Sequence, residues 1–146
     1  MDKKISFFGG TSGLGTEVIK TLSETYEIDS VGSSKVNLLK EDEIKKYFEV
    51  NYPDIVIIFS NYNYNSFIHK YDDFSDLDKQ LDINIKGVTK VISNSLKSMR
   101  DKGYGRIILA SSITVDKKIV GTSIYSSAKS YYESISQVKR TKGCSW

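Results

Sequence analysis

Several residue types are scarce in this sequence, and each scarcity excludes a class of protein. The 146 residues include one Cys, one His and one Pro, so an internal disulfide framework is excluded and a Cys/His zinc site is not expected. The longest purely apolar run, residues 55–59, is far shorter than the ~18 residues of a membrane span. The first residues also lack the long apolar stretch of a secretion signal. We therefore expect a cytoplasmic protein without a metal or a membrane segment.

The positive charge of the chain is small and dispersed. Lys and Arg number 21 against 18 Asp and Glu, which gives a net charge of +3, and the basic residues do not gather in one stretch. Such charge is typical of a solvated surface and not of a nucleic-acid interface. With 39% hydrophobic and 27% charged residues, the composition is that of one globular domain over residues 1–146.

Short apolar runs alternate with longer amphipathic ones, which is typical of βαβ units around a parallel sheet. The expected strands cover residues 4–8, 28–32, 54–60 and 105–111, with 36–39 as a further strand or only its stub. The expected helices cover residues 14–25, 41–50, 75–102 with a bend near Gly87, and 123–142. Uninterrupted β-branched residues predict that the strand at 54–60 is central and the one at 105–111 buried. The predicted fold class is α/β with a doubly wound parallel sheet.

A glycine-rich loop, Gly9-Gly10-Thr11-Ser12-Gly13-Leu14-Gly15, joins the first expected strand to the first helix. Unpaired backbone N–H groups and the helix dipole make such a loop a binding place for a diphosphate. Gly9, Gly13 and Gly15 supply a tight turn, a close approach of backbone to phosphate, and close packing of helix on strand. The loop predicts a dinucleotide cofactor; the alternative is a plain turn between strand and helix.

The segment after the second expected strand, Gly32-Ser33-Ser34-Lys35, carries no acid. An acid at this place bonds the ribose 2′-hydroxyl of NAD and repels the 2′-phosphate of NADP. Two hydroxyls and a cation therefore favour NADP over NAD. The alternative is that Lys35 only points into water.

Tyr125 and Lys129 lie at i and i+4, on one face of the last expected helix. A cation within about 4–6 Å lowers the pKa of a tyrosine, ordinarily about 10, by roughly 1–3 units. Tyr125 is thus suited to give a proton to a carbonyl oxygen, or to take one from an alcohol, during hydride transfer. Ser112 follows the preceding strand, where parallel sheets bind ligands, and its hydroxyl can hold the same oxygen.

These motifs together resemble the short-chain dehydrogenase/reductase family. Residues 9–15 match the glycine pattern of its classical members, residues 105–112 are similar to its serine strand, and residues 125–129 to its active-site helix. Asn84 resembles the helix asparagine of the family and precedes Ser112 by 28 residues, a separation that also agrees.

The resemblance implies a Rossmann-like domain that uses NADP, or NAD, to interconvert small carbonyl compounds and alcohols. It implies that Tyr125 exchanges the proton, that Ser112 orients the substrate, and that Asn84 holds a relay water near Lys129, which also bonds the nicotinamide ribose. The predicted catalytic residues are Asn84, Ser112, Tyr125 and Lys129. The predicted cofactor-binding residues are Gly9, Thr11, Ser12, Gly13, Leu14, Gly15, Ser33, Ser34, Lys35, Asn37, Ser60, Tyr125 and Lys129.

The sequence departs from the family in three places. Ile58-Phe59-Ser60-Asn61 replaces the usual Asn-Asn-Ala-Gly, the region before Val36 is shortened, and the resemblance stops within the last helix. We therefore expect an incomplete second half of the sheet, as in a truncated product. Two alternatives stay open: a catalytically silent nucleotide-binding remnant, and a fragment that dimerises through helices 75–102 and 123–142, which form the homo-oligomer interface in many relatives.

Overall fold

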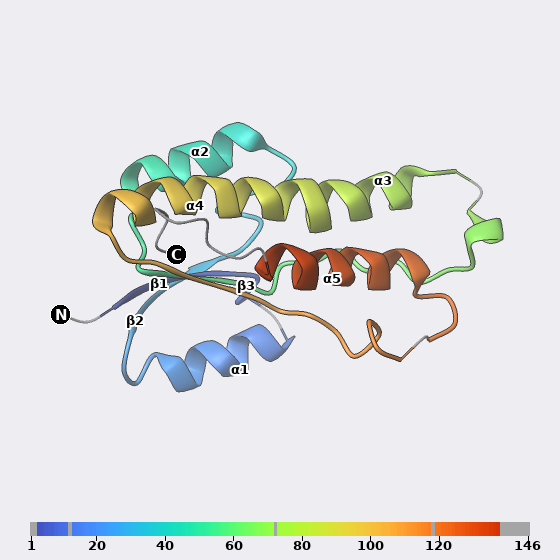
Figure 1. The fold of residues 1–146 in the computed structure, drawn as a ribbon, viewed down its shortest axis with the longest axis horizontal. Helices are drawn as coiled ribbons and strands as arrows, with labels where there is room; N and C mark the ends of the chain where they lie inside the picture. The colour runs from blue at the N-terminus through green and yellow to red at the C-terminus, as the bar shows by residue number, and fades with distance from the viewer. Residues whose placement is uncertain (1–2, 12, 72, 118, 138–146) are drawn as a thin grey trace.

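Four parallel strands form one sheet in the computed structural model, which describes residues 3–11, 13–71, 73–117 and 119–137 (Figure 1). The strands are β1 (Lys4–Phe8), β2 (Glu27–Val31), β3 (Ile55–Ile58) and β4 (Arg106–Leu109). They lie in the order β2-β1-β3-β4, and each neighbouring pair is parallel. The predicted α/β class is confirmed, and β3 occupies the interior position expected for its uninterrupted apolar run.

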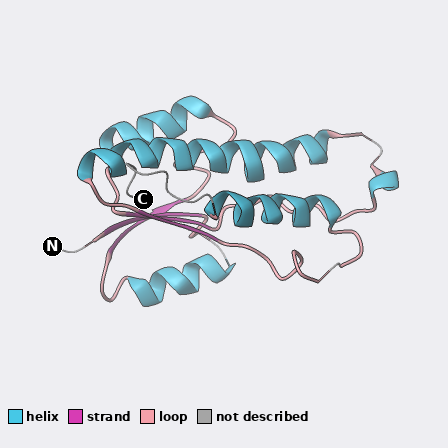
Figure 2. Ribbon diagram, viewed as in Figure 1, coloured by secondary structure: helices cyan, strands magenta, loops and turns pink. Residues whose placement is uncertain are grey.

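Helices cover both faces of the sheet, as Figures 1 and 2 show. One face carries α1 (Gly13–Leu22). The other face carries α2 (Glu41–Val50), α4 (Val88–Lys102) and α5 (Ser123–Ser136). This arrangement is the predicted doubly wound one.

The helix expected over residues 75–102 is present as one continuous stretch (Figure 2). It consists of α3 (Ser75–Leu81), the π-helical segment η2 (Asp82–Gly87) and α4. A Cβ at Gly87 would come within 2.8 Å of the Cβ of Leu38, so the absence of a side chain there lets the helix approach the turn after β2. Single π-helical turns inside α-helices frequently mark functional sites.

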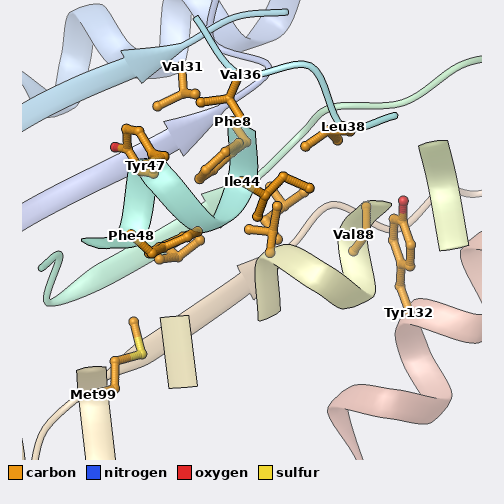
Figure 3. Close-up of a cluster of buried hydrophobic side chains, with 13 residues drawn as sticks. Phe8, Val31, Val36, Leu38, Ile44, Tyr47, Phe48, Val88, Met99 and Tyr132 are labelled. Carbon is orange, nitrogen blue, oxygen red and sulfur yellow. The ribbon is translucent and has the colours of Figure 1, made fainter. Parts of the chain in front are cut away.

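Two apolar clusters hold the helices to the sheet. The larger one lies between the sheet and α2, α4 and α5 (Figure 3). Its buried members include Phe8, Val31, Ile44, Phe48, Ile58, Val88 and Tyr132. The smaller one joins Ile5, Phe7 and Ile57 to the face of α1 that carries Val18, Ile19 and Leu22. Each large apolar side chain so buried contributes roughly 1.5–3 kcal/mol, which fixes both helical layers.

The interpretation of residues 36–39 as a strand or its stub is wrong. These residues form a turn in which the side-chain oxygen of Asn37 accepts a hydrogen bond from the backbone N–H of Leu39 at 3.0 Å. Val36 and Leu38 are buried in the larger cluster. The apolar residues therefore fill the core without pairing to a strand.

The prediction that the strand at 105–111 is buried is also wrong. Among the described residues β4 pairs only with β3, so it is an edge strand, and Ile108 remains 42% exposed. A groove of about 740 Å³ runs along its outer side between α4 and α5, lined by Leu96, Leu109 and Ile135 among others. The expected incomplete second half of the sheet corresponds to this open edge in the described part of the chain.

Candidate cofactor and active site

The carboxyl ends of β1 and β3 are neighbours at the point where the chain changes direction across the sheet. From β1 the chain crosses to β2 through α1, whereas from β3 it crosses the opposite way to β4. Doubly wound sheets bind ligands in the crevice at such a switch point. The glycine loop follows β1 and Ser60 follows β3, and the Ser60 N–H donates to the carbonyl oxygen of Phe8 at 3.0 Å. Both predicted cofactor segments therefore meet at this crevice.

The glycine loop is packed so that side chains are excluded from its interior. Gly9 has φ of 87°, and a Cβ there would overlap the backbone nitrogen of Ser60. A Cβ at Gly15, in the first turn of α1, would overlap the carbonyl oxygen of Gly9. Gly13 begins α1 with φ of 54°, and among the described residues nothing beyond its chain neighbours and its own helix lies within 4 Å of the place of its missing Cβ. The start of α1 is therefore open backbone, as a diphosphate site requires.

The other predicted loop residues fall into two groups. Thr11 and Leu14 are exposed, Leu14 with 71% of its surface. Ser12 lies outside the described residues. Their contact with a cofactor stays a prediction.

The segment after β2 exposes both of its serines, Ser33 and Ser34. Lys35, however, is paired: its ammonium lies 2.5 Å from a carboxylate oxygen of Asp29, inside β2. The other oxygen of Asp29 accepts a hydrogen bond from the hydroxyl of Tyr47 at 2.7 Å. Residues 32–35 carry no acid, but Asp29 reaches this segment from within the strand, so the alternative that Lys35 only points into water is wrong.

Asn37 follows β2 and Ser60 follows β3, at the carboxyl ends of their strands. The side chain of Asn37 is half-buried and closes the turn to Leu39, while its backbone N–H donates to the carboxylate of Glu43 at 2.8 Å. Ser60 is half-buried beside Gly9. Neither arrangement tests a cofactor contact, which stays a prediction for both residues.

Lys129 is the most deeply buried member of the predicted catalytic set after Asn84. It is 2% exposed, and its ammonium donates a hydrogen bond to the carbonyl oxygen of Ala110 at 2.8 Å. The ammonium also lies 5.6 Å from the ring centre of Tyr125 and 4.5 Å from that of Tyr132. Burial disfavours the charged form and lowers the pKa of Lys129 to about 8. The i, i+4 spacing thus brings the cation to Tyr125 as predicted.

Ser112 follows β4 and lies in a short turn. Its hydroxyl oxygen accepts hydrogen bonds from the backbone N–H of Thr114 at 3.3 Å and from the Thr114 hydroxyl at 3.0 Å. A serine oxygen has two acceptor lone pairs and one O–H donor. With both lone pairs engaged, the Ser112 O–H is left to donate to a further group.

Asn84 is completely buried within η2 and holds the loop that follows β3. Its side-chain oxygen accepts from the backbone N–H of Tyr62 at 2.7 Å, and its side-chain nitrogen donates to the carbonyl of Tyr62 at 2.7 Å. One N–H and one oxygen lone pair of the amide are therefore engaged in holding that loop. A role in holding a relay water stays a prediction.

The structure thus gathers most predicted residues at one edge of the sheet. The glycine loop, Ser33 and Ser34, Ser60 and Ser112 each follow the carboxyl end of a different strand. Sequence reasoning missed the partners Asp29 and Thr114. A polar residue inside an apolar strand pattern was the available signal for Asp29, and a threonine two residues after a serine was the signal for Thr114.

The described residues were also compared with what a metal site and a membrane span require. No group of three or more His, Cys, Asp or Glu side chains among them could hold a metal ion. None of their helices is both long and apolar enough to cross a bilayer.

Known proteins are similar to this chain in sequence and in fold. The sequence is 28% identical over 153 residues to an uncharacterized oxidoreductase of Staphylococcus saprophyticus, a match that covers 88% of this chain and 62% of the relative. The chain therefore spans about three fifths of the length of that curated relative. The fold is similar to a small-chain dehydrogenase solved in complex with NADPH, with a TM-score of 0.83, 20% identity, and coverage of 94% of this chain and 64% of the other.

A second solved structure has the same fold. It is a short chain dehydrogenase from Leptospira borgpetersenii with bound NAD+, with a TM-score of 0.74, 18% identity, and coverage of 90% of this chain and 61% of the other. The family profile described as short chain dehydrogenase matches residues 34–142, which is most of the sequence. The chain belongs to the short-chain dehydrogenase/reductase family.

Proposed function

We propose that this protein is an NAD(P)-dependent oxidoreductase that interconverts a small carbonyl compound and its alcohol. The observation that carries the proposal is the position of Lys129, beside the Tyr125 ring and bonded to the carbonyl of Ala110, two residues before Ser112. Lys129 therefore lies beside the ring of the proton-exchanging Tyr125 and is bonded to the chain two residues before the donor Ser112. Such a set is suited to acid–base work on one oxygen atom.

The residues present fit a dinucleotide cofactor. In the backbone cradle formed by the glycine loop, Gly9 and Gly15 leave no room for a Cβ, whereas the start of α1 at Gly13 is open. Ser33 and Ser34 would face the ribose, and Lys129 would bond the nicotinamide ribose as family resemblance implies. The proposal includes a preference for NADP over NAD, supported by the absence of a carboxylate within residues 32–35.

The chemistry divides between the cofactor and the chain. A bound nicotinamide supplies a hydride to the carbonyl carbon, or accepts one from the alcohol. The Tyr125 hydroxyl gives its proton to the carbonyl oxygen as the alcohol forms and regains a proton from solvent. The O–H of Ser112 donates a hydrogen bond to the same oxygen and holds it in place. The positive charge of Lys129 stabilises the phenolate that Tyr125 becomes.

Replacing Tyr125 by Phe tests this assignment. The change removes the exchangeable proton and leaves the ring, so NADPH binding should persist while turnover of a ketone or aldehyde falls by roughly 10² to 10⁴. Tyr132→Phe is the matched control on the same helix. The hydroxyl of Tyr132 is buried without a hydrogen-bond partner among the described residues, so its loss should not lower stability and should leave turnover unchanged.

The results separate the possible functions. Undiminished turnover in Tyr125→Phe would contradict the acid–base role. A wild-type chain that binds NADPH but turns over no ketone, aldehyde or alcohol of a broad panel would favour the second candidate, a nucleotide-binding protein without catalysis. The observation in favour of that candidate is that the glycine cradle is formed within the described residues, whereas β4 is an edge strand there, beside an open groove. A chain that binds neither NADPH nor NADH would refute both.

The proposal extends to partners and location on the strength of sequence and family resemblance. We propose a small-molecule substrate, a cytoplasmic location, and pairing of two copies through the helical stretch 75–102 (α3, η2 and α4) and the last helix, expected over residues 123–142, of which α5 is described. Sedimentation of the purified chain measures the last of these, and a monomer at micromolar concentration would contradict it.

A further inference from the structure

Lys35 is the cation that the sequence places where the ribose 2′-phosphate of NADP would lie, yet the structure gives it a partner within the protein. Its ammonium lies 2.5 Å from one carboxylate oxygen of Asp29. The side chain of Lys35 is 49% exposed and that of Asp29 is 32% exposed. The pair therefore lies at the surface, where a ligand can reach the lysine.

Asp29 is held in place independently of Lys35. Its second oxygen accepts from the Tyr47 hydroxyl at 2.7 Å, and the hydroxyls of Tyr47 and Ser6 are 2.6 Å apart. Tyr47 is only 6% exposed, and burial raises its pKa, so the hydroxyl keeps its proton and remains a donor. Asp29 is thus anchored through α2 and β1, and any movement of Lys35 toward a ligand breaks the ion pair.

Asp29 itself is poorly suited to bond the ribose. It lies inside β2, two residues before Val31, where the strand ends, and both of its oxygens have partners. Its negative charge faces α2, beside the ring of Tyr47, whose centre is 5.7 Å from the Lys35 ammonium. Its influence on a nucleotide therefore passes through Lys35.

We propose that Asp29 competes with the 2′-phosphate of NADPH for Lys35 and so limits the preference of this protein for NADPH over NADH. Asp29 is in this sense a positioning residue for cofactor choice. The inference rests on the proposed function, because it assumes a dinucleotide at the end of β2. An exposed or half-exposed ion pair is weak, so Lys35 can exchange between Asp29 and the 2′-phosphate. Both arrangements of the lysine are therefore populated when NADPH is bound.

The test compares the affinities of NADPH and NADH, which needs no turnover. In Asp29→Asn the amide oxygen still accepts from Tyr47, whereas the charge that holds Lys35 is gone. NADPH should then bind about twofold to fivefold more tightly, with the affinity for NADH nearly unchanged. In the double variant Asp29→Asn/Lys35→Met this gain should disappear. The same pattern should hold for 2′,5′-ADP against 5′-AMP, which isolates the 2′-phosphate.

Glu27→Gln is the matched control. Glu27 also lies on β2 and pairs with Lys4 at 3.5 Å, so its change removes one negative charge without releasing Lys35. It should leave the ratio of NADPH to NADH affinity as in the wild type. An equal increase in Glu27→Gln and Asp29→Asn, or an increase that persists in the double variant, would overturn the inference in favour of a general effect of net charge.

A second comparison keeps the inference testable if Asp29→Asn does not fold. Lys35→Met alters an exposed side chain, and because Lys35 is already engaged by Asp29, the single change should weaken NADPH binding by about threefold or less. A loss of tenfold or more would show that Lys35 is fully available in the wild type and would refute the competition. Absence of binding of both nucleotides to the wild type would instead refute the proposed function.

Discussion

Lys129 and Ala110 connect α5 to the carboxyl end of β4. The buried ammonium of Lys129 donates to the backbone carbonyl of Ala110 at 2.8 Å, next to the strand end from which Ser112 follows. The same ammonium lies against the rings of Tyr125 and Tyr132. One side chain therefore links α5 to the end of β4, and its burial lowers its pKa from an ordinary 10.5 to about 8.

The depressed pKa of Lys129 predicts a specific pH dependence of stability. Between pH 8 and 10.5 the unfolded chain keeps the lysine proton that the folded protein has released, so a rise in pH favours the folded state through this group. From pH 8 to 9.5 the contribution should reach about 2 kcal/mol. Urea unfolding of wild type and Lys129→Met at both pH values measures it.

The comparison with Lys129→Met is needed because other groups titrate in the same range. Burial raises the pKa of Tyr47 and of Tyr132, and such groups lose stabilising protonation as the pH rises past the ordinary value of about 10. Both tyrosines stay mostly protonated up to pH 9.5 in the folded and the unfolded chain, so they contribute little to the difference between the two proteins. Identical pH slopes for the two proteins would contradict the assigned pKa.

The packing of the glycine loop predicts that Gly15→Val abolishes nucleotide binding. A Cβ at Gly15 would overlap the carbonyl oxygen of Gly9, so the loop must move away from the place where backbone meets phosphate. We expect the far-ultraviolet circular dichroism of a folded protein and no measurable NADPH binding by fluorescence titration. Retained binding at wild-type affinity would indicate that the loop is only a turn.

Gly103→Ala is the control for this variant. Gly103 follows the last residue of α4 with φ of 69°, and in the described part of the chain nothing beyond its chain neighbours lies within 4 Å of its missing Cβ. Alanine there should cost about 1 kcal/mol of stability through the left-handed conformation alone. Its affinity for NADPH should equal that of the wild type, which separates a loss of stability from a loss of the site.

The two hydrogen bonds between the Asn84 side chain and the Tyr62 backbone predict that Asn84→Ala destabilises the protein. The change leaves the backbone N–H and carbonyl of Tyr62 without their partners, which should cost about 1–3 kcal/mol in the free energy of unfolding. Asn94→Ala, in α4, removes a side-chain bond to the carbonyl of Lys90 within the same helix and should cost less than 1 kcal/mol. Equal decreases in the free energy of unfolding of the two variants would show that the bonds from Asn84 to Tyr62 stabilise the protein no more than a bond within one helix does.

Much of the fold could be predicted from periodicity because local sequence and burial agree there. The run Ile55-Val56-Ile57-Ile58 is apolar on both faces and became the interior strand β3. The turn at 36–39 could not be recognised, because Val36 and Leu38 are buried by packing and not by strand pairing. The edge position of β4 could not be predicted either, since exposure of Ile108 depends on what lies beside the strand.

In the candidate site, too, contacts set by local sequence could be predicted, whereas contacts between distant segments could not. The approach of Lys129 to Tyr125 follows from an i, i+4 spacing that any helix enforces, so the sequence alone predicts it. The pairing of Lys35 with Asp29 joins a turn to the interior of a strand, and no period relates the two. Cofactor choice is therefore the part of the function for which a pattern of residue types was least informative.

The hydrogen bonds from Thr114 to Ser112 predict that Thr114 sets the direction in which the serine hydroxyl points. Thr114→Val removes the hydroxyl that donates to the Ser112 oxygen, so one lone pair of that oxygen becomes free. A ligand can then meet either this lone pair or the Ser112 O–H, and the serine no longer acts as a donor alone. Turnover should fall by about twofold to tenfold, the worth of one hydrogen bond, while NADPH affinity stays unchanged. Thr114→Ser keeps the donor and should retain wild-type turnover.

The effect of Thr114→Val on turnover should also be measured in a protein that carries Ser112→Ala. If Thr114 acts only through Ser112, the change Thr114→Val should have no further effect on turnover once Ser112 is alanine, because the hydroxyl it orients is absent. The measured quantities are turnover of one ketone substrate and the affinity for NADPH in the four proteins of the cycle. A drop of the same size in both backgrounds would show that Thr114 supports the fold of the turn and does not orient Ser112.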